Sequence, residues 1–189
     1  MPTANVKNSP TRGELKLLGA VEALGFDFRD KIVLDIGSST GGFTEVALDK
    51  GAKKVVAVEK GTGQMKAPLR YDSRVELHEK TDIFDVNTLG QIDVVLADVS
   101  FVSLRPILIK AKELVGRKAE FLVMLKPQFE AKPEQLVKGV VKNEKIRREI
   151  IKSFEKWLLK NGFVILNKRD NQLAGKNGNK ERFYLLKLV

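Results

Sequence analysis

Short runs of branched apolar residues alternate along this chain with amphipathic segments. Apolar residues at helical spacing run from Leu15 to Leu24, and Gly25 is a typical helix end. Further helices are predicted over 42–50, over 104–115 and, after a capping side chain at Asn143, through Leu158. The apolar runs predict strands over 31–37, 55–60, 74–80, 92–99, 119–126, 162–168 and 182–189.

This alternation of strands and helices predicts an α/β fold with a mostly parallel sheet and helices on both faces. The internal strands are apolar on both sides, as burial between two helical layers requires. Only about ten residues separate Lys168 from Glu181, and they are rich in Gly and Asn. That length suits a hairpin better than a helical crossover, so the seventh strand is expected to run antiparallel.

Composition narrows the possible chemistry. The chain has 189 residues, no Cys and one His, which fits one domain and excludes disulfides, thiolate catalysis and multi-histidine metal sites. Apolar runs are too short for a membrane span, and the first residues lack the apolar core of a signal peptide, so a cytoplasmic protein is expected. Residues 1–11 are interpreted as a flexible tail or linker remnant, and 12–189 as the domain.

The net charge of +10 lies almost entirely in the last third of the chain. Residues 1–125 carry 18 basic and 17 acidic side chains, whereas 126–189 carry 16 basic and 7 acidic ones. A solvated, lysine-rich helix would explain part of this excess. The alternative is a surface that binds a polyanion, and nucleic acid is favoured over a membrane because no strongly apolar amphipathic stretch accompanies the charge.

The turn after the first strand has the composition of a nucleoside-cofactor site. It reads DIGSSTGG, where Ser39 breaks the GxGxxG dinucleotide fingerprint, and no phosphate-binding GKS or GKT follows. Glu59 ends the second strand and can accept both hydroxyls of a ribose, which disfavours NADP, while Asp82 can accept from an adenine amino group. These features fit S-adenosylmethionine better than NAD, and Asp35 is expected near the methionine end of that cofactor. The alternative interpretation of the segment is a tight turn that binds no ligand. The candidate cofactor-binding residues are Asp35, Gly37, Ser38, Ser39, Thr40, Gly41, Gly42, Phe43, Glu59, Asp82 and Asp98.

Two charged residues end neighbouring apolar strands. Asp98 follows VVLA and Lys126 follows FLVML, so both side chains are expected in one crevice. A lysine in a partly dehydrated site has a lowered pKa and can act as a general base toward a hydroxyl, with the aspartate orienting it. Solvated strand-end charges are the alternative interpretation.

Several motifs together resemble one family. In order they are TRGELKL (11–17), DIGSSTGGFTEVAL (35–48), AVEKGTGQ (57–64), DVSFVSLR (98–105), LKPQFE (125–130), KGVV (138–141) and GNKE (178–181). The combination resembles the TlyA haemolysin and ribosomal RNA methyltransferases, a branch of the FtsJ-like Rossmann methyltransferases. The resemblance implies a Rossmann-like class I methyltransferase fold with seven strands, and 2′-O-methylation of ribose in ribosomal RNA or a ribosomal subunit, with S-adenosylmethionine as cofactor.

The resemblance also implies a catalytic tetrad of Lys16, Asp98, Lys126 and Glu181. Lys126 would activate the ribose 2′-hydroxyl, Asp98 and Glu181 would hold and tune it, and Lys16 would help to position the nucleotide. Lys16 alone is typical of a solvated helix lysine, and neither it nor Glu181 is placed at the site by periodicity. Phe101, Phe129 and Arg105 follow the two strand ends and are candidates for stacking on a base.

The chain departs from the family in three places. The family usually carries an N-terminal S4 RNA-binding domain, to which no segment of residues 1–189 is expected to correspond, whether that domain was removed or is naturally absent. Glu14 stands where a second glycine is usual, and the glycine run near Gly139 is one residue shorter. Two alternative functions remain at this stage: a methyltransferase for a small-molecule hydroxyl, and a non-catalytic RNA-binding or ribosome-assembly factor. A Rossmann dehydrogenase is disfavoured by Ser39, and the sequence shows no pore-forming pattern.

Overall fold

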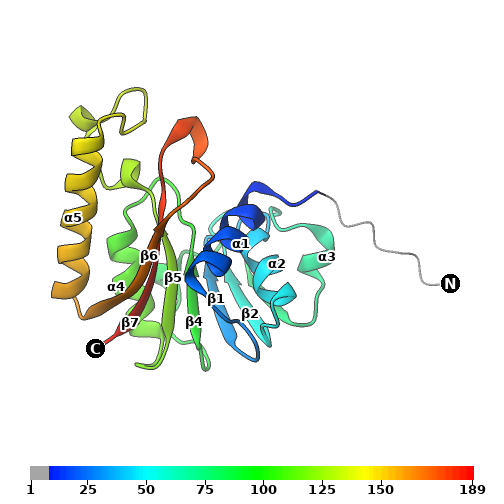
Figure 1. The fold of residues 1–189 in the computed structure, drawn as a ribbon. Coiled ribbons are helices and arrows are strands. Elements are labelled where there is room, and N and C mark those ends of the chain that lie inside the picture. The colour runs from blue at the N-terminus through cyan, green and yellow to red at the C-terminus, as the bar shows by residue number, and fades with distance from the viewer. Residues whose placement is uncertain (1–8) are drawn as a thin grey trace.

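The computed structural model describes residues 9–189 of the chain, so most of the predicted tail lies outside it. A seven-stranded sheet in the order β3-β2-β1-β4-β5-β7-β6 forms the centre of the molecule (Figure 1). Its strands are β1 (Ile32–Ile36), β2 (Lys54–Val58), β3 (Val75–His78), β4 (Val94–Ala97), β5 (Glu120–Leu125), β6 (Phe163–Asp170) and β7 (Arg182–Leu188). The α-helices are α1 (Arg12–Leu24), α2 (Gly42–Asp49), α3 (Ala67–Arg70), α4 (Leu104–Leu114) and α5 (Glu144–Lys160).

The last strand enters the sheet between two others. β1 to β5 pair in parallel, whereas β7 runs antiparallel to both β5 and β6. The short polar connection from Asp170 to Arg182 forces this reversal, because it is too short for a crossover over the sheet. The expected fold class and the antiparallel last strand are therefore confirmed.

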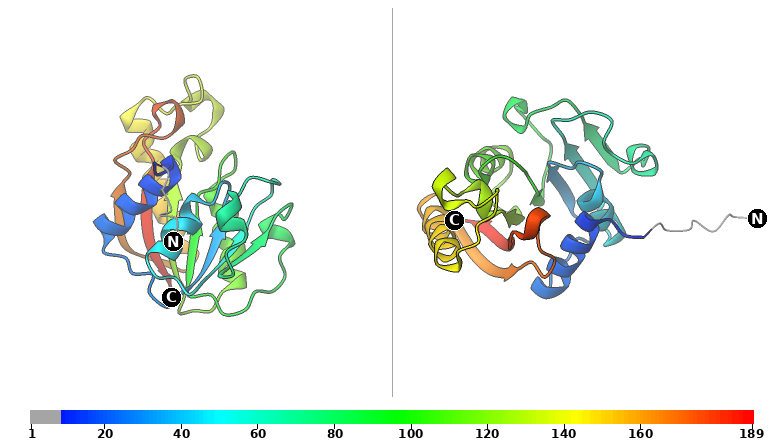
Figure 2. Two further views of the ribbon diagram at one scale, coloured as in Figure 1. Left: turned by 90° about the vertical axis from the view of Figure 1, so that its right-hand side faces the viewer. Right: turned by 90° about the horizontal axis from the view of Figure 1, so that it is seen from above.

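Helices cover both faces of the sheet, as the apolar strands require (Figure 2). On one face, α1 and α2 pack on β1, β2 and β5 around Leu17, Phe43 and Val55. On the other, α4 and α5 pack around Leu108, Phe121 and Phe154. No helix within residues 9–189 is long and apolar enough to cross a membrane.

The first helix is fixed at both ends. Thr11 caps it with its side chain in a reciprocal arrangement with Glu14, and Gly25 ends it in the left-handed conformation at φ 63°. Leu17 is fully buried while Leu15 is exposed. The adjacent Gly42 makes close approach possible, since a Cβ there would lie 3.0 Å from the Thr11 hydroxyl. The start of α1 is thereby held against the turn that follows β1.

Candidate active site

The carboxyl ends of β1, β2, β4 and β5 meet at one edge of the sheet, and the turn between β1 and α2 lies there. Three positions of this turn are left-handed: Gly37 at φ 79°, Ser39 at φ 49° and Gly41 at φ 91°. A methyl group on Gly41 would also overlap the side chain of Leu69. The small residues of DIGSSTGG are therefore required by the path of the backbone.

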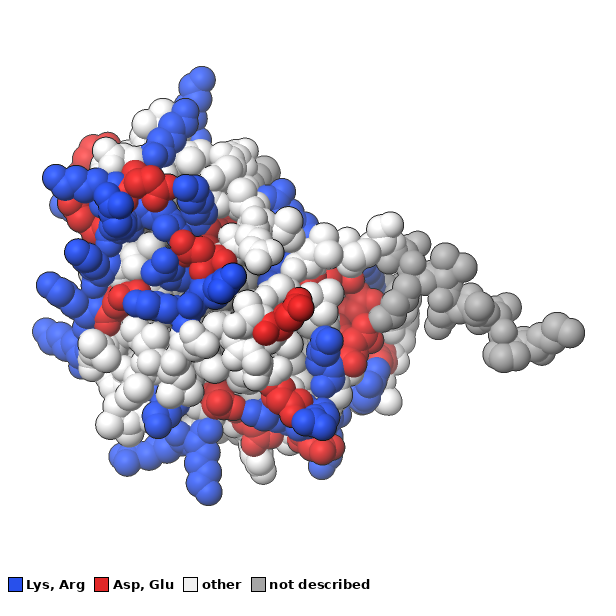
Figure 3. All heavy atoms as spheres, in the orientation of Figure 1, with Lys and Arg blue, Asp and Glu red and all other residues white. Residues whose placement is uncertain are grey.

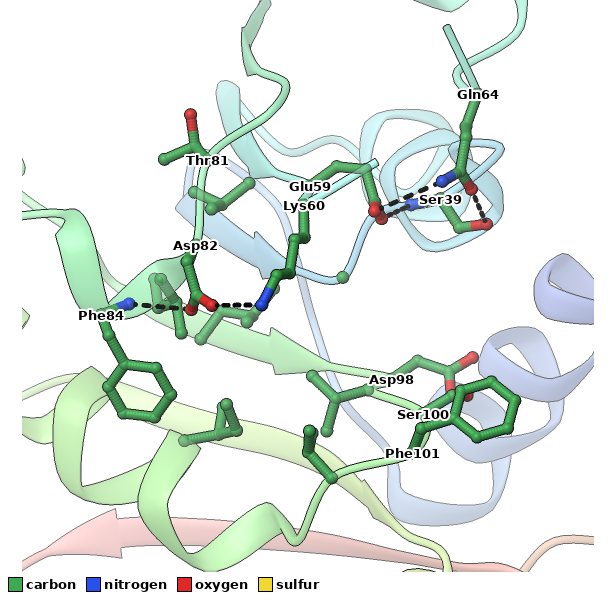
Figure 4. Close-up of a pocket in the computed structure, with 17 residues that line it drawn as sticks. Ser39, Glu59, Lys60, Gln64, Thr81, Asp82, Phe84, Asp98, Ser100 and Phe101 are labelled. Atoms are coloured by element: carbon green, nitrogen blue, oxygen red, sulfur yellow. Dashed lines mark hydrogen bonds and ion pairs between the residues drawn. The ribbon is translucent and has the colours of Figure 1, made fainter. Parts of the chain in front are cut away.

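Two adjoining cavities open at this edge. The larger, of about 480 Å³, is lined by Gly37, Ser39, Glu59, Asp82 and Asp98 among others (Figure 4). The smaller, of about 210 Å³, is lined by Gly13, Gly37, Ser38, Ser39, Thr40, Gly42, Phe43, Asp98, Ser100 and Lys126. The two share Gly37, Ser39, Asp98 and Ser100, so a ligand in the larger cavity reaches the residues of the smaller one.

Both strand-end acids expected to hold a nucleoside line the larger cavity. One Glu59 oxygen accepts from the Ser39 amide at 2.8 Å and the other from the Gly61 amide at 2.6 Å. Asp82 accepts from the Phe84 amide at 3.2 Å and from Lys60 at 2.9 Å, and the Lys60 contact lowers the pKa of Asp82. These bonds hold both carboxylates in place as hydrogen-bond acceptors at the cavity wall.

Asp35 occupies a different environment from the other acids of the site. It is fully buried, lines neither cavity, and accepts a hydrogen bond from the Thr44 hydroxyl at 2.7 Å. Burial is the largest cause that raises the pKa of Asp35, the bond from Thr44 opposes it, and the charges of Asp98 and Glu59 add to it, so that the pKa reaches about 7. Any influence of Asp35 on a ligand therefore passes through the turn rather than through direct contact.

Asp35 is expected to make stability fall with rising pH. Its pKa in the folded chain exceeds the ordinary value of 3.8, so the folded state binds more protons between about pH 4 and pH 7. Asp35→Asn removes this contribution, whose slope approaches about 1.4 kcal/mol per pH unit for one proton. Urea unfolding of both proteins across this window measures the difference. Parallel pH profiles for the two would contradict the assignment.

Asp98 and Lys126 form an ion pair just beyond the ends of β4 and β5, as the strand pattern predicts. Lys126 Nζ lies 2.7 Å from Asp98 Oδ1 and donates to the Ser100 hydroxyl at 2.6 Å. Burial raises the pKa of Asp98, whereas the positive charges of Lys126 and Lys16 counteract that rise. Lys126 is thus held at a fixed position in the wall of the smaller cavity.

Lys16 and Glu181 form a second pair next to the first. Their charged groups are 2.6 Å apart, and the residues are only 8% and 2% exposed. Both influence the ionisation of Asp98, which places all four side chains in one electrostatic cluster. The interpretation of Lys16 as a solvated lysine from the helix pattern alone is wrong, because the chain end brings Glu181 against the inward face of α1.

The connection between β6 and β7 positions Glu181. Asn171 donates from its backbone to the Glu181 carbonyl at 2.9 Å, and a Cβ on Gly175 would overlap the Glu181 carboxylate. The buried Asn179 donates to the Gly139 carbonyl at 3.1 Å and accepts from the Val141 amide at 3.2 Å. Sequence reasoning missed Asn179; its place in GNKE, two residues before Glu181, was the available signal.

A second missed residue, Glu130, joins the segment after Lys126 to the segment after Asp98. Its carboxylate accepts from the Leu104 amide at 2.7 Å and from Arg105 at 3.0 Å, which fixes the start of α4. Arg105 also lies over the ring of Trp157 and is therefore engaged within the fold rather than free to stack on a base. Phe101, in contrast, is 87% exposed and its ring lies 5.4 Å from that of Phe129.

The chain is similar in sequence to two proteins named as ribosomal RNA methyltransferases. The chain is 35% identical over 176 residues to the 23S rRNA (cytidine-2′-O)-methyltransferase TlyA of Campylobacter jejuni, covering 92% of this chain and 69% of that protein. It is 36% identical over 181 residues to the 16S/23S rRNA (cytidine-2′-O)-methyltransferase TlyA of Mycobacterium tuberculosis, covering 94% and 68%.

A solved structure and a family profile also match this chain over most of its length. A hemolysin-like protein of Streptococcus thermophilus superposes with a TM-score of 0.92 at 32% identity, covering 99% of this chain and 70% of that one. The sequence profile of FtsJ-like methyltransferases matches residues 10–188, nearly the whole described chain. The expected family is thus confirmed: this chain belongs to the FtsJ-like methyltransferases.

Proposed function

We propose that this protein transfers a methyl group from S-adenosylmethionine to the 2′-hydroxyl of a ribose in ribosomal RNA. The carrying observation is the buried cluster of Lys16, Asp98, Lys126 and Glu181 beside a nucleoside-sized cavity. The names of its relatives in Campylobacter and Mycobacterium describe the same chemistry on ribosomal RNA. The basic excess of the last third fits a polyanionic substrate.

The residues of the two cavities fit S-adenosylmethionine. Its bound sulfonium would supply the methyl group. A volume of about 480 Å³ is within the range of cofactor pockets, and Glu59 and Asp82 present acceptors suited to ribose hydroxyls and an adenine amino group. Ser38 Oγ is buried in the smaller cavity without a hydrogen-bond partner among residues 9–189, as expected of a hydroxyl that binds a ligand.

Lys126 is assigned the central role at the target hydroxyl. In its neutral form, Nζ accepts the 2′-hydroxyl proton; in its charged form, it stabilises negative charge that develops on the oxygen. Asp98 and Ser100 hold Nζ in place. Lys16 and Glu181 complete the charge balance, so that the cluster holds two positive and two negative groups, of which Asp98 and Lys126 line the smaller cavity.

Phe101 is assigned to the target base. Recognition of a nucleotide within folded RNA requires the base to leave its stack, and an exposed aromatic ring stabilises the displaced base. Phe101 is held at φ 66° at the mouth of the larger cavity, three residues after Asp98. Its ring is backed by Phe129, which follows Lys126 in the same way.

Titration calorimetry with S-adenosylmethionine tests the cofactor site. We expect micromolar binding to the parent chain and none of NAD. Glu59→Ala removes a charged acceptor of the ribose and is expected to weaken binding by about 10- to 100-fold. Glu22→Ala, on the exposed face of α1, is the matched control and keeps the parent affinity. Equal affinities of Glu59→Ala and the parent would remove Glu59 from the site.

Methyl transfer itself is measured with labelled cofactor and purified ribosomal RNA, followed by nucleoside analysis. Label in a 2′-O-methylnucleoside is the expected result. Cofactor binding with transfer only to small hydroxyl compounds would favour a small-molecule methyltransferase. RNA binding without transfer to any acceptor, in the presence of bound cofactor, would favour a non-catalytic RNA-binding protein.

A further inference from the structure

The outward face of α5 carries a row of positive side chains. It consists of Lys145, Arg148, Lys152, Lys156 and Lys160, all exposed and here called the α5 basic stripe. Successive members are three or four residues apart, so they lie on one side of the helix. The opposite side is buried in the core through Ile150, Ile151, Phe154 and Leu158.

The acidic residues of α5 do not neutralise this stripe. Glu144 pairs with Lys180 at 2.5 Å, and Glu155 pairs with Lys168 at 2.8 Å while accepting from the Tyr184 hydroxyl at 3.0 Å. Within residues 9–189, by contrast, no stripe member forms an ion pair or a side-chain hydrogen bond. A helix face built only for solubility typically pairs Glu and Lys four residues apart. Here Glu144, Glu149 and Glu155 lie within three or four residues of stripe members, but two of these three acids are paired with lysines outside the stripe, so the stripe keeps a net positive charge.

The stripe starts at the edge of the sheet that holds the tetrad. α5 begins there after the loop that follows Lys126, and this loop adds the exposed Lys132, Lys138 and Lys142. Figure 3 shows Lys and Arg side chains gathered along the border of the molecule where Figure 1 draws α5. From Lys145 to Lys160 the helix extends the row by about 22 Å away from the site.

The orientation of α5 relative to the catalytic cluster is fixed by a buried arginine. Arg147 is nearly fully buried, donates to the Lys180 carbonyl at 3.1 Å and pairs with Asp170 at 2.8 Å. Lys180 directly precedes Glu181. A polyanion lying on the stripe is therefore held in a defined register with the tetrad, rather than by an independently moving arm.

We propose that the α5 basic stripe binds the phosphate backbone of the RNA that flanks the target nucleotide; this rests on the proposed function. Unpaired Lys and Arg in a row at this spacing suit a phosphate backbone, which positions a substrate without reading its sequence. A membrane surface is a poorer match, because the apolar face of α5 is already buried within the protein.

The test compares two triple variants with equal loss of charge. Lys145→Gln/Lys152→Gln/Lys156→Gln removes three of the five members of the stripe, whereas Lys50→Gln/Lys53→Gln/Lys118→Gln removes exposed lysines near the opposite edge of the sheet. Binding is measured on a labelled 23S ribosomal RNA transcript between 50 and 200 mM salt. The stripe variant is expected to bind at least about tenfold more weakly at low salt and to lose about two to three units of salt slope.

Kinetics separate this role from catalysis. The stripe variant is expected to raise KM for RNA while kcat at saturating RNA and the affinity for S-adenosylmethionine stay at the parent values. The control variant is expected to match the parent in RNA affinity, salt slope, KM, kcat and affinity for S-adenosylmethionine. These combined readouts distinguish an RNA-binding surface from a helix that merely supports the fold.

The outcomes that overturn the proposal differ from those that overturn the proposed function. Equal RNA affinity and salt slope in the stripe variant and the parent would show that the stripe is only solvated. Stripe-dependent binding to vesicles containing phosphatidylglycerol, without binding to RNA, would also overturn it. Stripe-dependent RNA binding without any methyl transfer by the parent would refute the methyltransferase assignment and uphold the stripe.

Discussion

Replacing Lys126 by alanine is expected to abolish methyl transfer while leaving S-adenosylmethionine bound. Lys126 Nζ is held by Asp98 and Ser100 in the wall of the smaller cavity, where the proposed mechanism places the target hydroxyl. Loss of a positioned acid–base group typically costs about 10²- to 10⁴-fold in rate. Single-turnover transfer at saturating RNA and cofactor measures this step, and calorimetry measures cofactor affinity in parallel.

Two further variants sharpen this result. Lys118→Ala, at an exposed position two residues before β5, removes the same charge near the other end of the strand and is expected to keep the parent rate. Lys126→Arg keeps the charge but cannot give up its proton at neutral pH, so little recovery is expected if Lys126 acts as a base. Parent-like transfer by Lys126→Ala would refute the role assigned to this residue.

Removal of Glu181 is expected to have the largest effect on stability. Glu181→Ala leaves the ammonium of Lys16 buried at 8% exposure without its partner at 2.6 Å. Breaking one side of a buried pair typically lowers the free energy of unfolding by about 3 to 5 kcal/mol. Urea unfolding of the variant and the parent measures this loss in the free energy of unfolding. Lys180→Ala, which breaks the exposed pair with Glu144, is the control and is expected to cost less than about 1 kcal/mol.

A double variant separates stability from activity at the same pair. Lys16→Met/Glu181→Leu replaces both charges by apolar side chains and is expected to recover most of the lost stability, because no buried charge remains unpaired. Methyl transfer is nevertheless expected to be lost in this double variant, since the charge balance around Asp98 changes. A double variant as unstable as Glu181→Ala would show that packing, rather than the unpaired lysine, determines the loss.

Strand order alone predicted that two of the four clustered residues, Asp98 and Lys126, meet at one edge of the sheet. Asp98 and Lys126 stand one position beyond apolar strands, and parallel strands bring their carboxyl ends to one edge, so their meeting required no knowledge of side-chain packing. Glu59 and Asp82 follow from the same rule. Lys16 and Glu181 do not, because their contact joins the first helix to the last strand and leaves no periodic signal within either segment.

Contacts between distant loops were also beyond the reach of local patterns. The sequence pattern predicts Arg105 as a surface residue of α4, yet its guanidinium donates to Glu130 and lies over the ring of Trp157, both of which belong to other segments. Asn179 in a polar stretch reads as a loop residue, yet it is buried because the carbonyl of Gly139 and the amide of Val141 satisfy its amide group. Such residues are predictable only from motifs that recur together in a family, which is how GNKE and LKPQFE were recognised.

The place of β7 in the sheet has a consequence for the order in which this protein acquires its activity during synthesis. β7 is made after both of its neighbours yet lies between β5 and β6, and it is preceded directly by Glu181. Until Glu181 and β7 leave the ribosome, β5 lacks its neighbour and Lys16 lacks its partner. A nascent chain can therefore complete its first five strands and still hold only Asp98 and Lys126 together, so the four-residue cluster forms only after β7 has been made.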